Sequence, residues 1–107
     1  MSHQRPPSGG KVDANQPQIV RELRALGFRV DIVSQLKKLY DLVVTGRKNF
    51  DGDRELGYII ASVRVEIKMP NCDLTVDEKE YWSAESYPET LIIANDTEDI
   101  LEWFGRI

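Results

Sequence analysis

The sequence predicts an α/β fold in which one mixed four-stranded sheet is flanked by helices. Segments with the spacing of helices and segments with the alternation of strands follow one another in the order α-β-β-β-α-β-α. Three consecutive strands followed by a helical crossover to a fourth require both antiparallel and parallel neighbours in the sheet. A chain of 107 residues provides one modest core. We therefore predict a single domain over residues 13–107, preceded by a flexible tail rich in Pro, Gly and Ser over residues 1–12.

A helix followed by a strand is predicted directly after the tail. Asn15 or Gln16 can cap the helix, Pro17 suits its first turn, and Gly27 suits the position just after its end. The alternation of residues 28–33 predicts the first strand. The apolar residues of the helix that recur at helical spacing, and are expected to face the core together, are Ile19, Val20, Leu23 and Leu26.

The next two strands are predicted over residues 40–45 and 58–69. Residues 46–57 between them are predicted to be a turn-rich insert, because they contain Asp51 followed by a glycine, a strong hairpin signal. Pro70 ends the third strand, since proline cannot donate a hydrogen bond to a neighbouring strand. The side chains of this strand alternate, with Val63, Val65 and Ile67 on one face and Arg64, Glu66 and Lys68 on the other.

The last three elements are a helix, a short strand and a second helix. Thr75 is a natural N-terminal cap, and Glu78, three residues further on, completes a capping box. This helix is predicted to run to about Ser86. The apolar residues 90–94 predict the fourth strand. Residues 97–104 predict the final helix, whose inward side chains are expected to be Ile100, Leu101 and Phe104.

Composition and the few special residues limit the class of protein. Hydrophobic residues make up 41% of the chain and charged residues 30%, as in ordinary globular proteins. The apolar runs are too short to span a membrane, and the N-terminus lacks the apolar stretch of a signal peptide, so we expect a cytoplasmic protein. The single Cys72 cannot form an internal disulfide and is interpreted as an incidental loop thiol. His3, the only histidine, lies in the tail, which argues against a His-based general base or zinc site.

The net charge of −4 hides an asymmetry between the two halves of the chain. Residues 1–49 carry nine Lys or Arg and four Asp or Glu, a net charge of +5, whereas residues 50–107 carry five and fourteen, a net charge of −9. The basic residues of the first half could share a face that binds a phosphate backbone, or they could be ordinary solvated surface. The candidates for such a face are Arg21, Arg24, Arg29, Lys37, Lys38, Arg47 and Lys48.

Three charged side chains are placed by the strand pattern at one end of the predicted sheet. Glu66 and Lys68 are two residues apart on a strand, so they share a face at a spacing of about 7 Å. Asp41 begins the preceding strand and can join them if the two strands pair. Two carboxylates and an ammonium around one point could hold a divalent metal ion and hydrolyse a phosphodiester. The alternative is an ordinary Glu–Lys pair on a solvent-facing edge, because an acidic-x-Lys tripeptide is common by chance.

The order of these motifs along the chain resembles that of the small phage-type nucleases of the PD-(D/E)xK superfamily. Their close relatives are the VRR-NUC domains and the archaeal Holliday junction resolvases. The resemblance covers about residues 13–104 and implies a restriction-endonuclease-like arrangement of the four-stranded sheet. No single motif is specific, but their order and their placement on the elements together are. The motifs are the runs Asp13-Ala-Asn-Gln16, Ile19-Val20, Leu23-Arg24-Ala25-Leu26-Gly27, Asp41-Leu-Val-Val-Thr-Gly46, Val65-Glu-Ile-Lys68 and Leu74-Thr-Val-Asp-Glu78.

The resemblance implies a role for each matching residue. Asp41 and Glu66 match the two acidic metal ligands, and the carbonyl of Ile67 would complete the protein's share of the coordination shell. Oxygen ligands of this kind suit Mg²⁺ or Mn²⁺. Lys68 matches the invariant lysine, which would orient the attacking water and offset charge building on the phosphorane. Gln16 matches a family glutamate on the first helix, so the site would have one negative charge fewer and would bind either a single metal ion or metal only weakly.

Other positions correspond less closely to the family pattern. Glu78 falls where VRR-NUC-like sequences often have glutamine. Ser34 could lie near the scissile phosphate, as serines in the same loop of relatives do, or could be a simple turn serine. Tyr40 replaces the proline of the motif name, which is not a ligand. Residues 46–57 form a longer loop than in the resolvases and could contact DNA, a second subunit or nothing. The residues that we expect to contact DNA are Arg21, Arg24, Ser34, Lys37 and Lys38.

The function implied by the resemblance is that of a metal-dependent DNA endonuclease selective for branched, flapped or Holliday junction DNA. Such junction cutters act as symmetric dimers, because two opposed strands must be nicked, so we expect a homodimer. If the chain is phage-encoded, its expected location is the cytoplasm of the bacterial host, without a membrane partner. Gln16 in place of an acid, and the acidic second half, leave open a non-catalytic module that binds nucleic acid or protein. A restriction-type enzyme with sequence specificity is a third interpretation, against which the short chain argues.

Overall fold

The computed structural model describes residues 14–34, 40–50, 54–70, 72, 74–84 and 87–107. The predicted tail over residues 1–12 lies outside these residues. The helices and strands in chain order are α1 (Gln16–Ala25), β1 (Arg29–Ile32), β2 (Leu42–Asn49), the 3₁₀ turn η2 (Arg54–Leu56), β3 (Tyr58–Ile67), α2 (Val76–Ser83), the 3₁₀ turn η3 (Pro88–Thr90), β4 (Leu91–Ala94) and α3 (Thr97–Trp103).

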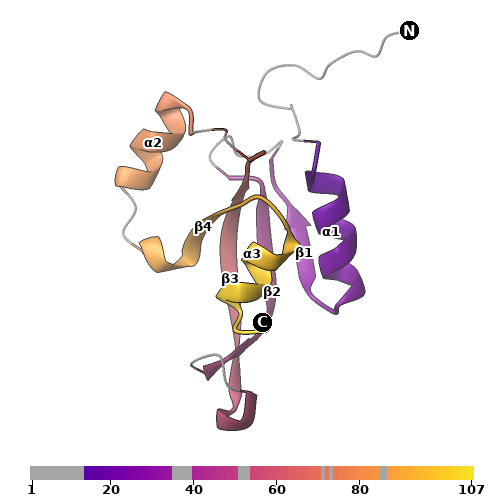
Figure 1. Cartoon of the computed structure of the whole chain (residues 1–107). Helices are drawn as coiled ribbons and strands as arrows, with labels where there is room; N and C mark the ends of the chain where they lie inside the picture. Colours follow the sequence, from indigo (N-terminus) through magenta and orange to yellow (C-terminus); the bar gives the residue numbers. More distant parts are fainter. Residues whose placement is uncertain (1–13, 35–39, 51–53, 71, 73, 85–86) are drawn as a thin grey trace, which may run out of the picture.

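The described strands form one sheet in the order β1-β2-β3-β4. β1 and β2 are antiparallel, β2 and β3 are antiparallel, and β3 and β4 are parallel. The chain reaches β4 through α2, because a parallel neighbour can start only after a crossover to the other end of the sheet. The prediction of a small α/β domain with a mixed four-stranded sheet and three helices is confirmed, and Figure 1 shows this arrangement.

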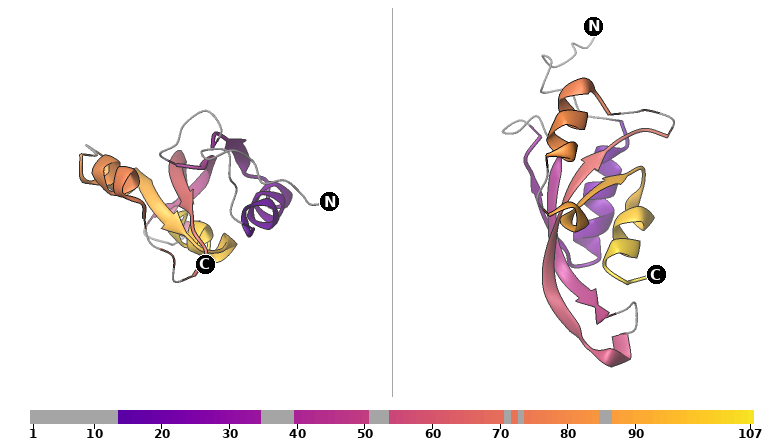
Figure 2. Two further views of the ribbon diagram at one scale, coloured as in Figure 1. Left: turned by 90° about the horizontal axis from the view of Figure 1, so that it is seen from above. Right: turned by 90° about the vertical axis from the view of Figure 1, so that its left-hand side faces the viewer.

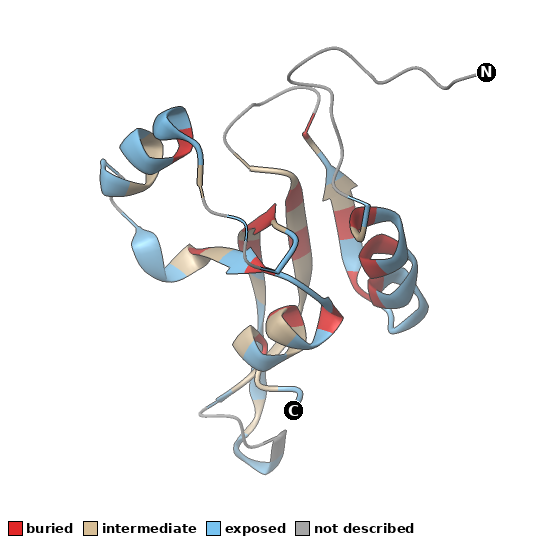
Figure 3. Ribbon diagram, turned by 45° about the horizontal axis from the view of Figure 1, so that its top comes forward, coloured by how far each residue is buried: buried red, intermediate tan, exposed pale blue. Residues whose placement is uncertain are grey.

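The core lies between one face of the sheet and two helices. Leu42 is opposite Val65 in the register of β2 and β3, Val44 is opposite Val63, and all four side chains are fully buried. α1 and α3 cover this face, as Figure 2 shows, and Figure 3 shows buried residues where the helices and strands face each other. Leu101 is only partly buried against a core cluster composed of Ile19, Val20, Leu23, Phe28, Val30, Leu42, Val44, Val63, Val65, Ile67, Ala94, Ile100 and Phe104.

α1 begins and ends close to its predicted limits, but two details of the prediction are wrong. Asn15 occupies the cap position without a side-chain cap hydrogen bond, because its Nδ2 donates to the carbonyls of Lys68 and Asn95 instead. Leu26 is 50% exposed, because the helix ends one residue earlier and the chain turns toward β1. Gly27 adopts a φ of +94°, which confirms its predicted place just after the helix end.

β2 is longer than the sequence predicts. It continues to Asn49 and pairs with β3 as far as Tyr58, so the prediction of an insert that begins at Gly46 is wrong. A Cβ atom at Gly46 would lie 2.4 Å from Cδ1 of Phe28, so this glycine makes room for an aromatic ring and does not mark a turn. The hairpin signal predicted at residues 51–52 lies outside the described part of the chain.

Past its neighbours in the sheet, the hairpin of β2 and β3 continues alone. β1 pairs with β2 only as far as Thr45, and β4 pairs with β3 only from Arg64 onward. Residues 46–49 of β2 and 58–61 of β3 therefore form a two-stranded extension, which we call the hairpin arm. Figure 1 shows the arm extending past the C-terminus, at the end of the sheet opposite to α2.

The predicted capping box of α2 is confirmed. The Thr75 hydroxyl accepts a hydrogen bond from the backbone N–H of Glu78 (3.2 Å), and the Glu78 carboxylate accepts one from the N–H of Thr75 (2.8 Å). α2 ends at Ser83, earlier than predicted. α3 is capped by Asp96, whose carboxylate accepts from the N–H of Asp99 at 3.0 Å. None of the described helices is long and apolar enough to cross a membrane.

Candidate functional site

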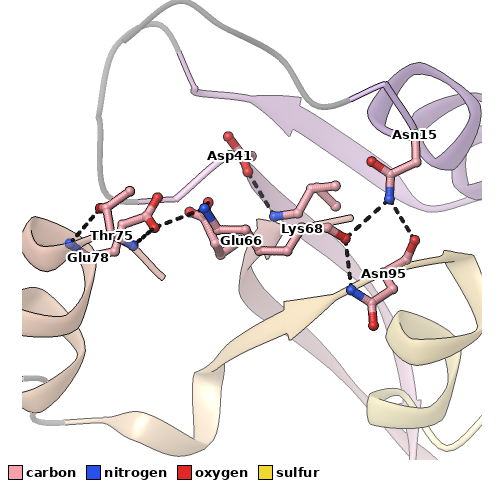
Figure 4. Close-up of polar contacts among 8 residues, drawn as sticks. Asn15, Asp41, Glu66, Lys68, Thr75, Glu78 and Asn95 are labelled. Atoms are coloured by element: carbon pink, nitrogen blue, oxygen red, sulfur yellow. Dashed lines mark hydrogen bonds and ion pairs between the residues drawn. The ribbon is translucent and has the colours of Figure 1, made fainter. Parts of the chain in front are cut away.

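The site is organised by the paired ends of β2 and β3. The register places Leu42 opposite Val65, and Asp41 lies directly before Leu42, at the start of β2. The backbone N–H of Asp41 donates to the carbonyl of Val65 at 2.8 Å. Its side chain then turns to the strand end, where Oδ2 accepts a hydrogen bond of 2.8 Å from the N–H of Ile67 (Figure 4). The strand pairing therefore confines the Asp41 carboxylate to the end of β3.

Lys68 follows β3 directly and lies between two glutamates. Its Nζ is 3.6 Å from Oε2 of Glu66 and 3.0 Å from Oε1 of Glu78. The Lys68 side chain is only 14% exposed, and both glutamates are buried. Figure 4 shows Glu78 reaching this point from the first turn of α2, which the capping box with Thr75 orients. The sequence-predicted trio is thus joined by a fourth charged group.

The charges of these groups are strongly coupled. Burial raises the pKa of Glu66 from 4.5 to about 9, with further contributions from the nearby Asp41 carboxylate and from a hydrogen bond to Glu78, whereas Lys68 opposes the shift. Burial also acts to raise the pKa of Glu78, but the hydrogen bond from Thr75 and the Lys68 ammonium outweigh it and lower this pKa. The two pKa values are thus shifted in opposite directions, so a proton bound at this point favours Glu66 over Glu78.

The carboxyl groups at the strand ends are the residues that could hold a divalent cation, because carboxylate oxygens are the ligands that Mg²⁺ and Mn²⁺ prefer. Glu66 and Glu78 share the ammonium of Lys68, and the Asp41 carboxylate lies close enough to Glu66 to help raise its pKa. The N–H and C=O of one residue in a regular strand point to the same side, so we expect the Ile67 carbonyl on the side of Asp41. In the part of the chain that the structure describes, no group of three Asp, Glu, His or Cys side chains has the arrangement of a complete metal site. Water or substrate oxygens would have to complete the coordination shell.

Gln16 lies at the N-terminus of α1, close to the end of β3. Its neighbour Asn15 donates to the carbonyls of Lys68 (3.4 Å) and Asn95 (2.7 Å), and Asn95 Nδ2 donates to the Lys68 carbonyl at 2.8 Å. The Gln16 side chain is buried, and its Oε1 has no hydrogen-bond partner among the described residues. The structure thus brings Gln16 near the site without a described contact to Asp41.

The residues predicted to bind DNA have mixed surroundings. Arg21 is exposed on α1, whereas Arg24 donates to the carbonyl of Val30 at 2.8 Å and so links α1 to β1. Ser34 is buried, and its hydroxyl has no hydrogen-bond partner among the described residues. Lys37 and Lys38 lie outside the described residues.

The other basic candidates make local contacts. Arg29 forms an exposed ion pair with Asp31 at 3.3 Å. The Arg47 guanidinium lies 4.7 Å from the ring centre of Tyr58, and the Lys48 ammonium lies over the ring of Trp103 and donates to its carbonyl. No common basic face follows from these contacts.

Arg64 is a residue of the site that the sequence reasoning did not single out. It lies two residues before Glu66, on the same face of β3. Its guanidinium donates to the Tyr81 hydroxyl (2.9 Å), the Thr90 hydroxyl (3.0 Å) and the Tyr87 carbonyl (3.2 Å). These bonds hold α2 and η3 against the sheet, so Arg64 positions the helix that carries Glu78. An arginine on the same strand face as Glu66 was the available signal.

Comparisons of the chain with protein-family models, with curated proteins and with solved structures gave no match.

Proposed function

We propose that this protein is a metal-dependent DNA endonuclease that hydrolyses phosphodiester bonds. The observation that carries the proposal is the convergence of Asp41, Glu66 and Lys68 from two paired strand ends. This convergence is what separates a site from a chance acidic-x-Lys tripeptide. The proposal includes the PD-(D/E)xK relationship and a restriction-endonuclease-like arrangement, with which the sheet order and the crossover through α2 are compatible.

Asp41, Glu66 and the carbonyl of Ile67 would hold the cation, Mg²⁺ or Mn²⁺. Support comes from charge: the site has more carboxyl groups than cationic partners, and they are largely removed from solvent. A divalent cation would offset this excess where two buried carboxylates cannot ionise together at low cost. When bound, it would supply Lewis acidity to the phosphate and lower the pKa of water.

Lys68 would orient the attacking water and offset the negative charge that builds on the phosphorane. Its ammonium is held by Glu66 and Glu78 and is only partly accessible, so it occupies a defined position. Because the ammonium is already held in place, it needs little rearrangement during the reaction, which is the condition for effective electrostatic stabilisation. Glu78 would thus act through Lys68, as a positioning residue.

The proposed substrate is DNA, and branched, flapped or Holliday junction DNA in particular. We test this with the purified chain, Mg²⁺ or Mn²⁺, and matched branched, flapped and plain duplex DNA. We expect cleavage that Asp41→Asn abolishes. Asp31→Asn is the matched control, because Asp31 lies on the neighbouring strand β1 and forms a solvent-exposed ion pair with Arg29. The proposal fails if no DNA is cut, or if Asp41→Asn cuts as well as the parent.

A second candidate function is a non-catalytic module that binds nucleic acid or protein. The observation that favours it is the uncharged, buried Gln16 where the proposed family has a carboxylate. Calorimetric titration with Mn²⁺ discriminates between the two functions. Binding of Mn²⁺ that Glu66→Gln abolishes supports the nuclease. Binding of DNA or of a protein that neither a chelator nor Lys68→Ala alters supports the module.

A further inference from the structure

The hairpin arm leaves one edge of the sheet uncovered. β4 pairs with β3 only over residues 64–67, and no other described segment forms a hydrogen bond with the outer edge of β3 over residues 58–63. The outer edge of β2 is covered by contrast. There the Asn49 N–H donates to the Phe104 carbonyl (2.9 Å) and Asn49 Nδ2 donates to the Gly105 carbonyl (2.8 Å).

The backbone direction identifies the groups on this uncovered edge. Because the Asn49 N–H points outward to Phe104, Asn49 and its partner Tyr58 do not exchange backbone hydrogen bonds. The N–H and C=O of Tyr58 therefore point away from β2, and so do those of Ile60 and Ser62 by the two-residue alternation. These groups are the donors and acceptors of an unpaired strand.

The side chains of this edge are apolar and exposed. Ile60 is 65% exposed, Tyr58 51% and Ile59 47%. Residues 58–63 contain no charged residue and no proline. Natural proteins usually protect an exposed edge strand with lysine, proline or a bulge, so an uncharged and uncovered edge is suited to pairing with another strand.

We propose that the uncovered edge of β3 pairs with the same edge of a second copy of this chain. The two strands would run antiparallel about a two-fold axis, with Ile60 opposite Ile60 of the partner subunit. The alternation restricts the register, because the residues that exchange backbone hydrogen bonds across the interface must be those whose N–H and C=O point outward. β4 limits the paired segment at Arg64, so the segment is centred on Ile60 and places Tyr58 opposite Ser62 of the partner subunit.

Charge and area both favour a second copy as the occupant. Self-pairing of an uncharged segment places no like charges opposite each other. Half-exposed apolar side chains on and next to the arm, together with the strand backbone, offer on the order of 400–500 Å² per copy, about half to five-eighths of the roughly 800 Å² per partner of a standard interface, as in a weak dimer. The exposed apolar side chains of the arm and of the residues that adjoin it are Phe50, Leu56, Tyr58, Ile59 and Ile60.

The pairing would create a continuous eight-stranded sheet. A two-fold axis perpendicular to the sheet keeps both copies of Glu66 on one face. At about 3.3 Å per residue, they would lie roughly 40 Å apart along the strands. The pairing itself is independent of the proposed nuclease activity, and its test involves no DNA and no metal.

The test is the oligomeric state of the full chain, measured by sedimentation equilibrium over micromolar to millimolar concentrations. We expect a dimer, and we expect Ile60→Lys to raise its dissociation constant at least about tenfold, because two ammonium groups would then face each other in place of apolar contacts. Ile93→Lys is the matched control, since Ile93 is 42% exposed on β4, opposite Glu66 and so outside the proposed paired segment. Circular dichroism of each variant is used to check that it is folded. A monomer throughout, or a dimer that only Ile93→Lys weakens, overturns the proposal.

Cross-linking tests the register. In a Cys72→Ser background, Ile60→Cys places two thiols on residues whose Cα atoms would be about 5.5 Å apart, within reach of a short bismaleimide. We expect a covalent dimer from this variant and monomer from Ile93→Cys. Cross-linking of Ile93→Cys without cross-linking of Ile60→Cys would assign the interface to β4 and overturn the proposal.

Discussion

The ammonium of Lys68 lies 3.0 Å from Oε1 of Glu78, the same oxygen that accepts the N–H of Thr75 in the capping box of α2. One carboxylate thus begins a helix and holds the lysine of the candidate site. The position of Lys68 therefore depends in part on the local chemistry that begins α2.

Replacing Glu78 separates these two roles. Glu78→Gln keeps a side chain that can complete a capping box, but it removes the charged partner of Lys68. We expect the free energy of unfolding to fall by about 1.5–3 kcal/mol, the range for a hydrogen bond to a charged group. Glu78→Ala should cost more, because the capping box is lost as well. Urea denaturation measures both. Glu80→Gln, an exposed glutamate of the same helix, is the control and should have little effect.

The pKa of Glu66 makes a prediction about stability and pH. Because the folded pKa of about 9 exceeds the ordinary value of 4.5, the folded protein binds more protons than the unfolded chain between these values. The stabilising contribution is therefore complete below about pH 4.5 and is lost as the pH rises through about 9. We expect Glu66→Gln to flatten the decline in the free energy of unfolding over this range. Glu89→Gln, an exposed glutamate, is the control. Equal slopes for Glu66→Gln and the parent would contradict the prediction.

Much of the site follows from local rules. The period of two along β3 predicts that Glu66 and Lys68 share a face, and the apolar run after Asp41 predicts a strand that begins there. Thr75 and Glu78 form a capping box that the sequence pattern predicts. Each of these features depends on residues that are at most three positions apart.

The features that the sequence did not predict depend on contacts between distant segments. Arg64 is held by Tyr81, Tyr87 and Thr90, and only the crossover through α2 brings these residues to the strand. The contact between Lys68 and Glu78 needs the same crossover. Asn15 has the sequence of a helix cap, but the carbonyls of the sheet end compete for its amide. Tertiary contacts outweigh local preference at these positions.

Metal binding can be measured without DNA. If Asp41 and Glu66 hold a divalent cation, Mn²⁺ stabilises the folded protein, by about 2.7 kcal/mol at a concentration one hundred times the dissociation constant. We expect the midpoint of thermal unfolding to rise when Mn²⁺ is added and to fall back to its value without metal when EDTA is added. Asp41→Asn should remove the effect, although its amide oxygen can still accept from the Ile67 N–H. Asp31→Asn should keep it, and an equal Mn²⁺ response in Asp41→Asn would argue against these ligands.

Substitution of Gly46 distinguishes the turn that the sequence predicts at this position from the strand that the structure has. Gly46→Ala would place a methyl group 2.4 Å from Cδ1 of Phe28, whose ring packs against Phe104 with centroids 4.8 Å apart. We expect a loss of about 1–3 kcal/mol in the free energy of unfolding, because the packed ring cannot move freely. Phe28→Leu in the same chain should reduce that loss, and a double-mutant cycle measures the coupling. In a turn without positive φ, Gly46→Ala would stabilise by about 0.4–1 kcal/mol, so the sign of the effect decides between the two.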